Sequence, residues 1–183
     1  DRKIEQERNR HTRLLTETAR ALAESEKTMQ QIIQGSTTPT FVLNESHLVT
    51  HWNKAMESLT GYSADAMVGT SDQWQAFYAN KRRTMADVIL DQIGADEIKK
   101  LYGGRWRKSA LIEDAFEAEG FFPQLGDNGK WLWFTAAPIK TPNGKIMGAI
   151  ETLWDKTEDK KAEQEREHRT RELSSLCSIY SVL

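Results

Sequence analysis

The side chains that could carry out chemistry in this sequence are few, and their spacing matches no catalytic motif. His47 and His51 are four residues apart, a spacing that would bring two imidazoles together on a helix but not in a β-hairpin, which we expect here. His168 lies in the polar run Arg-Glu-His-Arg, whose residues do not resemble those around a phospho-accepting histidine. Glycine-rich nucleotide-binding, HExxH and GxSxG motifs do not occur. We therefore predict no catalytic centre and no metal site in this chain.

A single cysteine, Cys177, limits the redox chemistry. One thiol excludes an internal disulfide and a cysteine-rich zinc site, and it indicates a reducing compartment, so we expect a cytoplasmic location. No apolar run is long enough to span a membrane. The chain begins with Asp1 rather than Met, and we expect it to be part of a longer protein, whose membrane anchor, if it has one, would lie upstream.

Charge and aromatic residues are distributed unevenly along the chain. The 25 Lys+Arg and 27 Asp+Glu residues give a net charge of -2, which lacks the positive field of a general nucleic-acid binder. We therefore expect no nucleic-acid partner and no membrane contact. All aromatic residues except Tyr180 lie between residues 36 and 154. Because large rings dominate cores, we expect one central domain over residues 36–158 between two flanks that bury little.

The first flank, residues 1–35, is predicted to be a long signalling helix. Leu15, Leu22 and Met29 recur every seven residues, as in one column of a coiled coil. The second column is mostly polar, with Ile4 and Ile32 at its ends. A stripe this narrow predicts contact with a second helix, and we favour a homodimer. The alternative is a solvated helix that folds back on its own domain.

The second flank, residues 159–183, is predicted to be a linker helix toward an effector domain of the same protein. Asp155 and Glu158 have the spacing of a capping box. The helix is polar over most of its length, and apolar residues return only toward the end of the chain, at Leu173, Leu176, Tyr180 and Leu183.

The central segment reads as strands, then helices, then strands. Turn residues separate short apolar runs, and Asn53 and Gly61 are positioned to begin and end a short helix. This order predicts an α+β domain with an antiparallel sheet and helices on one face. The expected strands are 40–43, 48–52, 120–123, 130–139 and 146–154, and the expected helices are 54–60, 63–67 and 81–92. Residues 94–118 fit two short helices with a break at Gly103-Gly104.

Two groups of residues resemble PAS domains. The run Asn53-x-Ala55-x-x-x-Leu59-Thr60-Gly61-Tyr62-Ser63, followed by Met67-Val68-Gly69, resembles the family's second-strand-to-helix signature. The series Gly129-x-Trp131, Pro138-Ile139, Gly144, Gly148 and Asp155-x-Thr157 resembles its closing strands and exit motif. Lys156 departs from the usual Ile or Val of that motif, and residues 91–118 are longer than the usual link. The resemblance covers about residues 36–158.

The resemblance implies a five-stranded antiparallel sheet, with helices that enclose a small pocket. It also implies a sensory and dimerisation module of a multidomain signal-transduction protein, such as a sensor histidine kinase of a two-component system, a diguanylate cyclase or a chemoreceptor. Asn53, Asp155 and Thr157 would then relay the signal to the C-terminal output helix. The alternative is a PAS-like spacer that binds no ligand and acts as a dimerisation adaptor in a helical stalk.

The resemblance also raises the question of a cofactor. PAS domains that sense light through a covalent flavin carry a reactive cysteine inside the domain; Cys177 lies outside it, so the sequence predicts that this mechanism is excluded. Haem is disfavoured because the helix expected at 81–92 has no histidine. Binding of a small-molecule ligand remains an alternative. The candidate pocket residues are His51, Trp74, Phe77, Tyr78, Met85, Ile89 and Thr135. The alternative is that the aromatic rings only fill the core.

Overall fold

A computed structural model describes residues 2–180, with side chains to residue 174. Six antiparallel strands form one sheet in the order β2-β1-β6-β5-β4-β3, which confirms the α+β prediction. The strands are β1 Thr40–Asn44, β2 Val49–Trp52, β3 Trp106–Lys108, β4 Phe116–Phe122, β5 Lys130–Lys140 and β6 Ile146–Asp155. The helices are α1 Arg2–Gly35, α2 Lys54–Thr60, α3 Ala64–Met67, η1 Gln73–Ala76, α4 Met85–Asp91, α5 Ala95–Tyr102 and α6 Thr157–Tyr180.

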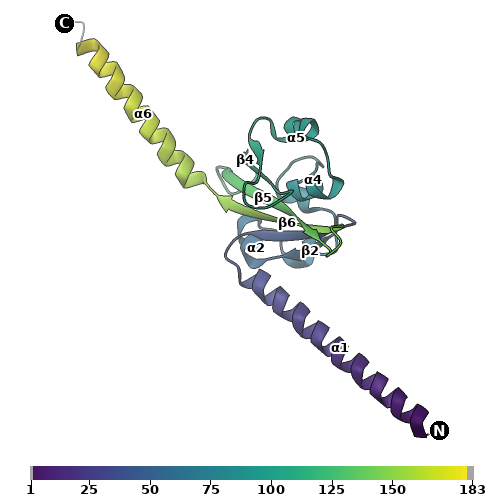
Figure 1. Ribbon diagram of the computed structural model, residues 1–183. Helices are drawn as coiled ribbons and strands as arrows, with labels where there is room; N and C mark the ends of the chain where they lie inside the picture. Colours follow the sequence, from purple (N-terminus) through teal and green to yellow (C-terminus); the bar gives the residue numbers. More distant parts are fainter. Residues whose placement is uncertain (1, 181–183) are drawn as a thin grey trace.

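The two long helices leave the domain at opposite ends (Figure 1). α1 has 34 residues, a length of about 50 Å at 1.5 Å per residue, and none of its side chains is buried. α6 begins two residues after the end of β6. Among residues 2–180, no helix combines the length and the apolar composition that a membrane crossing requires.

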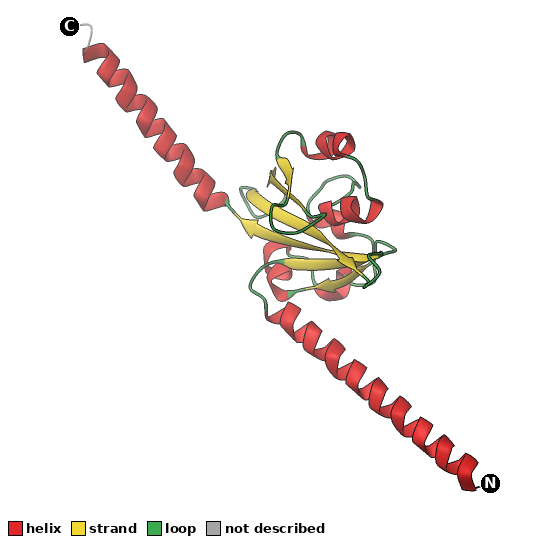
Figure 2. Cartoon of the chain, viewed as in Figure 1, coloured by secondary structure: helices red, strands yellow, loops and turns green. Residues whose placement is uncertain are grey.

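The short helices lie beside the sheet (Figure 2), and the buried hydrophobic side chains of the sheet and these helices form one core. Along β5, Leu132, Phe134 and Ala136 are buried, while the residues between them are partly exposed. The same alternation runs along β6, where Glu151 and Leu153 point to the helix side. Since side chains alternate across a strand, one face of the sheet carries the core and the other faces outward.

The structure has one strand more than the five that the sequence predicts. The additional strand, β3, pairs with β4 in antiparallel register, with Arg107 opposite Glu117. It has three residues, of which Trp106 alone is apolar, so it gives no periodic signal. The break at Gly103-Gly104 is present, but it leads from α5 into this strand rather than into a second helix.

Two further boundaries differ from the expected ones. β4 begins at Phe116 rather than at residue 120, and α4 begins at Met85 rather than at residue 81. The start of α4 is fixed by a capping box, in which Thr84 and Asp87 each bind the other's backbone N–H. In the predicted apolar stripe of α6, Leu173 is exposed, whereas Leu176, Tyr180 and Leu183 lie outside the described side chains.

Gly129, in the turn between β4 and β5, provides a test of this packing. Its φ is +72°, and an added Cβ would overlap the end of the Phe121 ring. Gly144 is a matched control, because its φ is +82° but no atom lies within 4 Å of its added Cβ. We expect Gly144→Ala to cost about 1 kcal/mol for the left-handed backbone. Gly129→Ala should cost about 0.5–1.5 kcal/mol more, because the exposed Phe121 ring must leave its rotamer.

Urea unfolding of the two variants measures this difference. Equal losses of stability would contradict the close packing of Phe121 over the turn.

Candidate functional site

Asn53 joins the incoming helix to the domain. Its side chain is fully buried, and its Oδ1 accepts hydrogen bonds from Thr40 N at 3.0 Å and Met56 N at 2.9 Å. It therefore caps α2 and holds the first residue of β1. Its Nδ2 donates to carbonyls of the segment that leads in from α1, at Thr38, Ile33 and Ser36.

The exit from the sheet is held by hydrogen bonds to the backbone of Trp131 in β5. Trp131 N donates to Thr157 Oγ1 at 3.0 Å, and Lys156 N donates to Trp131 O at 2.7 Å. Asp155 accepts from Thr157 N at 3.0 Å and pairs with Lys130. Burial opposes ionisation of Asp155, but the hydrogen bonds from Lys130 and Thr157 outweigh it and lower its pKa. The last residues of β6 and the first of α6 are thereby fixed to the neighbouring strand.

The first turn of α6 also contacts the outward face of the sheet. Lys160 Nζ lies 3.4 Å from a carboxylate oxygen of Glu119 in β4 and 5.7 Å from the centre of the Trp131 ring. A cleft of about 590 Å³ separates the helix from β3 and β4. Its lining mixes acids with bases, including Arg105, Arg107, Glu117, Glu119, Lys156, Asp159, Lys160 and Glu163.

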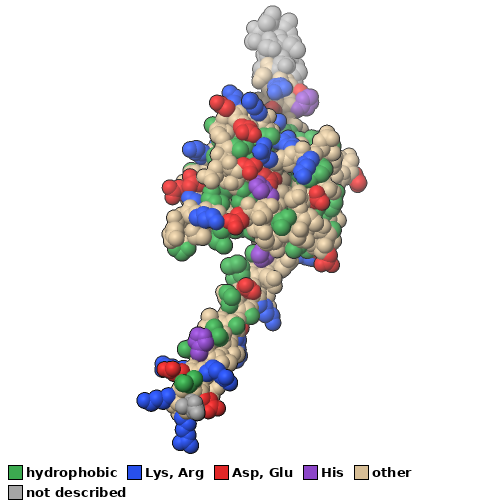
Figure 3. Space-filling model, turned by 90° about the vertical axis from the view of Figure 1, so that its right-hand side faces the viewer, with side chains coloured by type: hydrophobic (Ala, Val, Ile, Leu, Met, Phe, Trp, Pro, Cys, Tyr) green, Lys and Arg blue, Asp and Glu red, His purple; other side chains and the backbone are tan. Residues whose placement is uncertain are grey.

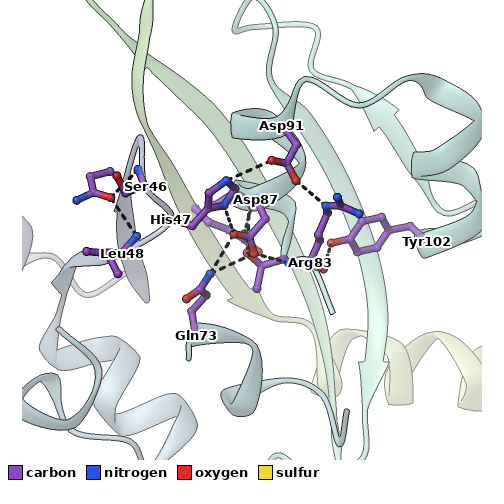
Figure 4. Close-up of polar contacts among 12 residues, drawn as sticks. Ser46, His47, Leu48, Gln73, Arg83, Asp87, Asp91 and Tyr102 are labelled. Atoms are coloured by element: carbon purple, nitrogen blue, oxygen red, sulfur yellow. Dashed lines mark hydrogen bonds and ion pairs between the residues drawn. The ribbon is translucent and has the colours of Figure 1, made fainter. Parts of the chain in front are cut away.

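A polar network lies on the other side of the domain, around α4 (Figure 4). Its centre is the buried carboxylate of Asp87, whose Oδ1 lies 2.7 Å from His47 Nδ1 and accepts from Gln73 Nε2 at 3.0 Å. Its Oδ2 accepts from both the backbone N and the Oγ1 of Thr84 at 2.8 Å. One side chain thus links α4 to η1 and to the turn between β1 and β2.

His47 extends the network to a second carboxylate. Its Nε2 lies 3.2 Å from Asp91 Oδ1, and Asp91 also pairs with Arg83. A neutral imidazole has one N–H group and can donate to one carboxylate only, whereas the imidazolium can donate to both. The positive φ of 62° at His47 directs the ring from the turn toward α4.

Glu151 is a buried acid on the central strand β6. It is 3% exposed, and its Oε2 accepts a hydrogen bond from Ala86 N at 2.8 Å. Burial raises the pKa of Glu151 to about 8; hydrogen bonds from the backbone of Ala86 and Met85 act in the opposite direction, and the nearby Asp87 adds to the increase.

The predicted pocket residues do not line one cavity. Phe77, Met85 and Ile89 are buried in the core. Tyr78 and Trp74 are half-buried. Tyr78 borders a recess of about 240 Å³ with Arg82 and Tyr102, and burial raises the pKa of Tyr78 to about 12.

His51 and Thr135 lie on the opposite, outward face of the sheet. His51 pairs across the strands with Val42, which pairs with Ile150, and Thr135 bonds to Thr152 at 2.8 Å. Burial lowers the pKa of His51. The alternation of side chains along each strand therefore separates these two residues from Phe77 and Met85.

Sequence reasoning missed the network of Glu151, Asp87 and His47. A signal for Glu151 exists: it occupies an inward position of β6 between Ala149 and Leu153, where alternation predicts an apolar residue. The contacts of His47 carry no such signal, because they join residues that are 40 positions apart.

This arrangement defines a class: an α+β domain with a single antiparallel sheet, joined to a helix at each end. Residues 27–72 match the family model described as PAS fold. Comparison with curated proteins gave no match.

Solved structures share the fold at low sequence identity. An RNA-binding light-oxygen-voltage receptor matches with a TM-score of 0.54 and 17% identity, over 80% of this chain and 37% of that one. This chain therefore spans just over a third of that receptor. The PAS domain of BvgS from Bordetella pertussis matches with a TM-score of 0.48 and 15% identity, over 80% and 98% of the two chains. A PAS domain from Colwellia psychrerythraea matches with a TM-score of 0.44 and 17% identity, over 72% and 97%. The chain has a PAS fold.

The comparisons correct the cofactor prediction. The sequence predicts that covalent flavin photosensing is excluded because Cys177 lies outside the domain, that haem is disfavoured, and that a small-molecule ligand is possible. The exclusion is wrong, because a light-oxygen-voltage receptor is among the solved structures that share this fold. The position of one cysteine addresses a single photochemical mechanism and does not decide which cofactors the fold can hold.

The two hairpin histidines allow a test of the Asp87 network. We expect His47→Asn to lower stability by about 1–3 kcal/mol, because Asp87 and Asp91 lose a hydrogen-bonding partner and asparagine tolerates the left-handed backbone. His51→Asn, on the outward face, should cost less than about 1 kcal/mol. Thermal or urea unfolding compares the two variants. A loss for His47→Asn no larger than that for His51→Asn would contradict a stabilising role of the network.

Proposed function

We propose that this chain is a dimeric PAS module that transmits a conformational change to its C-terminal helix, within a multidomain signal-transduction protein. The observation that carries the proposal is the exit junction, where Trp131 holds both Lys156 and Thr157. Because the same strand borders β6 along its length, a shift of the sheet must move the start of α6. Asn53, Asp155 and Thr157 are the relay residues of this proposal.

The exposed stripe of α1 supports the dimer. Leu15, Leu22 and Met29 are 58%, 60% and 58% exposed, and hydrophobic side chains recur along the visible side of the helix (Figure 3). A long helix that buries none of its own side chains gains little stability alone. Pairing with a second copy in register would cover this stripe.

The filled core favours a second candidate, a ligand-free spacer that only transmits motion along a helical stalk. The Phe77 ring lies 6.2 Å from Phe41 and 5.8 Å from Phe122, which in turn lies 5.9 Å from Phe134. These rings occupy the space between sheet and helices. Both candidates are non-catalytic, place an effector domain after α6 in the same chain, as in two-component sensors, and assume a cytoplasmic location.

The dimer can be tested at the α1 stripe. We expect Leu22→Lys to weaken self-association at least about tenfold, or about 1.4 kcal/mol, because it places a charge in the paired stripe. Gln31→Lys adds the same charge at an exposed position on the opposite side of α1 and should leave association unchanged. Sedimentation over a range of concentrations measures both. A monomeric parent chain, or equal effects of the two variants, would refute pairing through α1.

The relay can be tested at Thr157. Thr157→Val keeps the shape of the side chain but removes the Oγ1 that accepts from Trp131 N. We expect this loss to free the start of α6. Thr170→Val is the control, because it removes a similar hydroxyl from an exposed site further along the same helix.

A spin label on the single cysteine, Cys177, reports the distance between the two α6 helices of a dimer. We expect a broader distance distribution for Thr157→Val and an unchanged one for Thr170→Val. An unchanged distribution in both variants would mean that this junction does not direct α6.

A further inference from the structure

Glu151 lies in the sheet and contacts a helix that covers it. Its strand, β6, lies between β1 and β5 and runs directly toward α6, whose first residue is six positions further on. Its cross-strand neighbours are Phe41 and Ala136. Its Oε2 reaches across to Ala86 N in the first turn of α4. The Glu151 side chain is therefore a direct polar link between the helix layer and the strand that leads out of the domain.

Among the described residues, no positively charged side chain near Glu151 would balance a negative charge on its carboxyl group. Its electrostatic neighbour on α4 is a second acid, Asp87, and no described cation is paired with it. The other ionisable groups that face it are Tyr78 and Tyr102, on the segments beside α4 and in α5. The neighbours on β1 and β5 are uncharged. Arg82 lies over the two tyrosine rings, at 4.2 Å and 5.3 Å, and donates to the carbonyl of Leu101.

We propose that the proton of Glu151 is a latch: the neutral carboxyl holds α4 against β6, and its ionisation loosens α4 from the sheet. When the carboxyl is neutral, it accepts from Ala86 N without placing a charge in the buried core. The carboxylate would accept more strongly, but the cost of burying its charge outweighs that gain. When the proton passes to solvent water, a carboxylate remains next to Asp87 with little hydration. Because a buried unpaired charge is unfavourable, the space between α4 and β6 must open to admit water.

The pH range follows from the burial of this group. The pKa of Glu151 is about 8, above the 4.5 of an exposed glutamate. The stability that the proton contributes is therefore fully present below about 4.5 and is lost as the pH rises through about 8. The latch goes beyond the proposed relay and does not require it, because a monomeric chain would titrate in the same way.

The test compares the parent chain with Glu151→Gln, which keeps a neutral side chain at every pH. A matched control is Glu117→Gln: Glu117 is also buried on the sheet, but its ion pair with Arg107 and a hydrogen bond from Ser109 lower its pKa. The first readout is the amide resonance of Ala86 across the pKa of about 8. The second is the protection of the α4 amides against hydrogen exchange over the same range, expressed as protection factors so that the base catalysis of exchange is removed.

We expect the Ala86 amide to titrate near pH 8 in the parent chain and in Glu117→Gln, with the protection factors of the α4 amides falling above that pH. In Glu151→Gln both changes should be absent, and this variant should gain stability relative to the parent as the pH rises. An Ala86 amide that does not titrate, or α4 exchange with the same pH dependence in all three proteins, would overturn the latch. Neither result depends on whether α1 pairs, so failure of the latch and failure of the dimer are separate outcomes.

Discussion

The fold depends on one buried carboxamide, that of Asn53. Backbone N–H and C=O groups that are removed from water must find partners, and the chain entering the domain presents several of them in a small volume. Asn53 can donate and accept at once, so a single side chain satisfies the first residue of β1, the first turn of α2 and the carbonyls after α1. An acid, which only accepts when ionised, or an apolar residue could not fill this position.

Neighbouring strands of the sheet connect Asn53, where the chain enters the domain, to the end of β6, where the chain leaves it. Thr40, which donates to Asn53, pairs with Thr152 in β6, and Thr152 bonds in turn to Thr135 in β5. Thr152 lies three residues before Asp155, where the exit junction begins. The incoming and outgoing helices are therefore connected through a few hydrogen-bonded residues of neighbouring strands, although they project in opposite directions (Figure 1).

Helix-capping residues, the alternation of apolar residues and the PAS-like motifs predicted most of the helices and strands. Asn53 and Gly61 cap a helix where the sequence expects one, the strands follow the alternation of apolar residues, and the Asp155-x-Thr157 motif occurs at the end of the last strand. The misses have physical causes. β3 is too short to show a period, and the Glu151, Asp87 and His47 network is made by residues distant in sequence. The exclusion of covalent flavin photosensing failed because it treated the position of one cysteine as a property of the whole fold.

α1 is attached to the domain through its C-terminal end, so the geometry of the helix sets how its other end is oriented relative to the domain. The helix contacts the domain only near its C-terminal end, where Gln34 bonds to Trp52 O and Lys54 N, and Asn53 bonds to Ile33 O. Before this point α1 is a rod that projects away from the domain (Figure 1), and none of its side chains is buried. Each residue inserted into such a rod turns the preceding part by roughly 100° about its axis. In the proposed relay, an insertion in α1 would therefore change the rotational phase of the preceding helix relative to the domain, and an insertion of a whole heptad would nearly restore that phase.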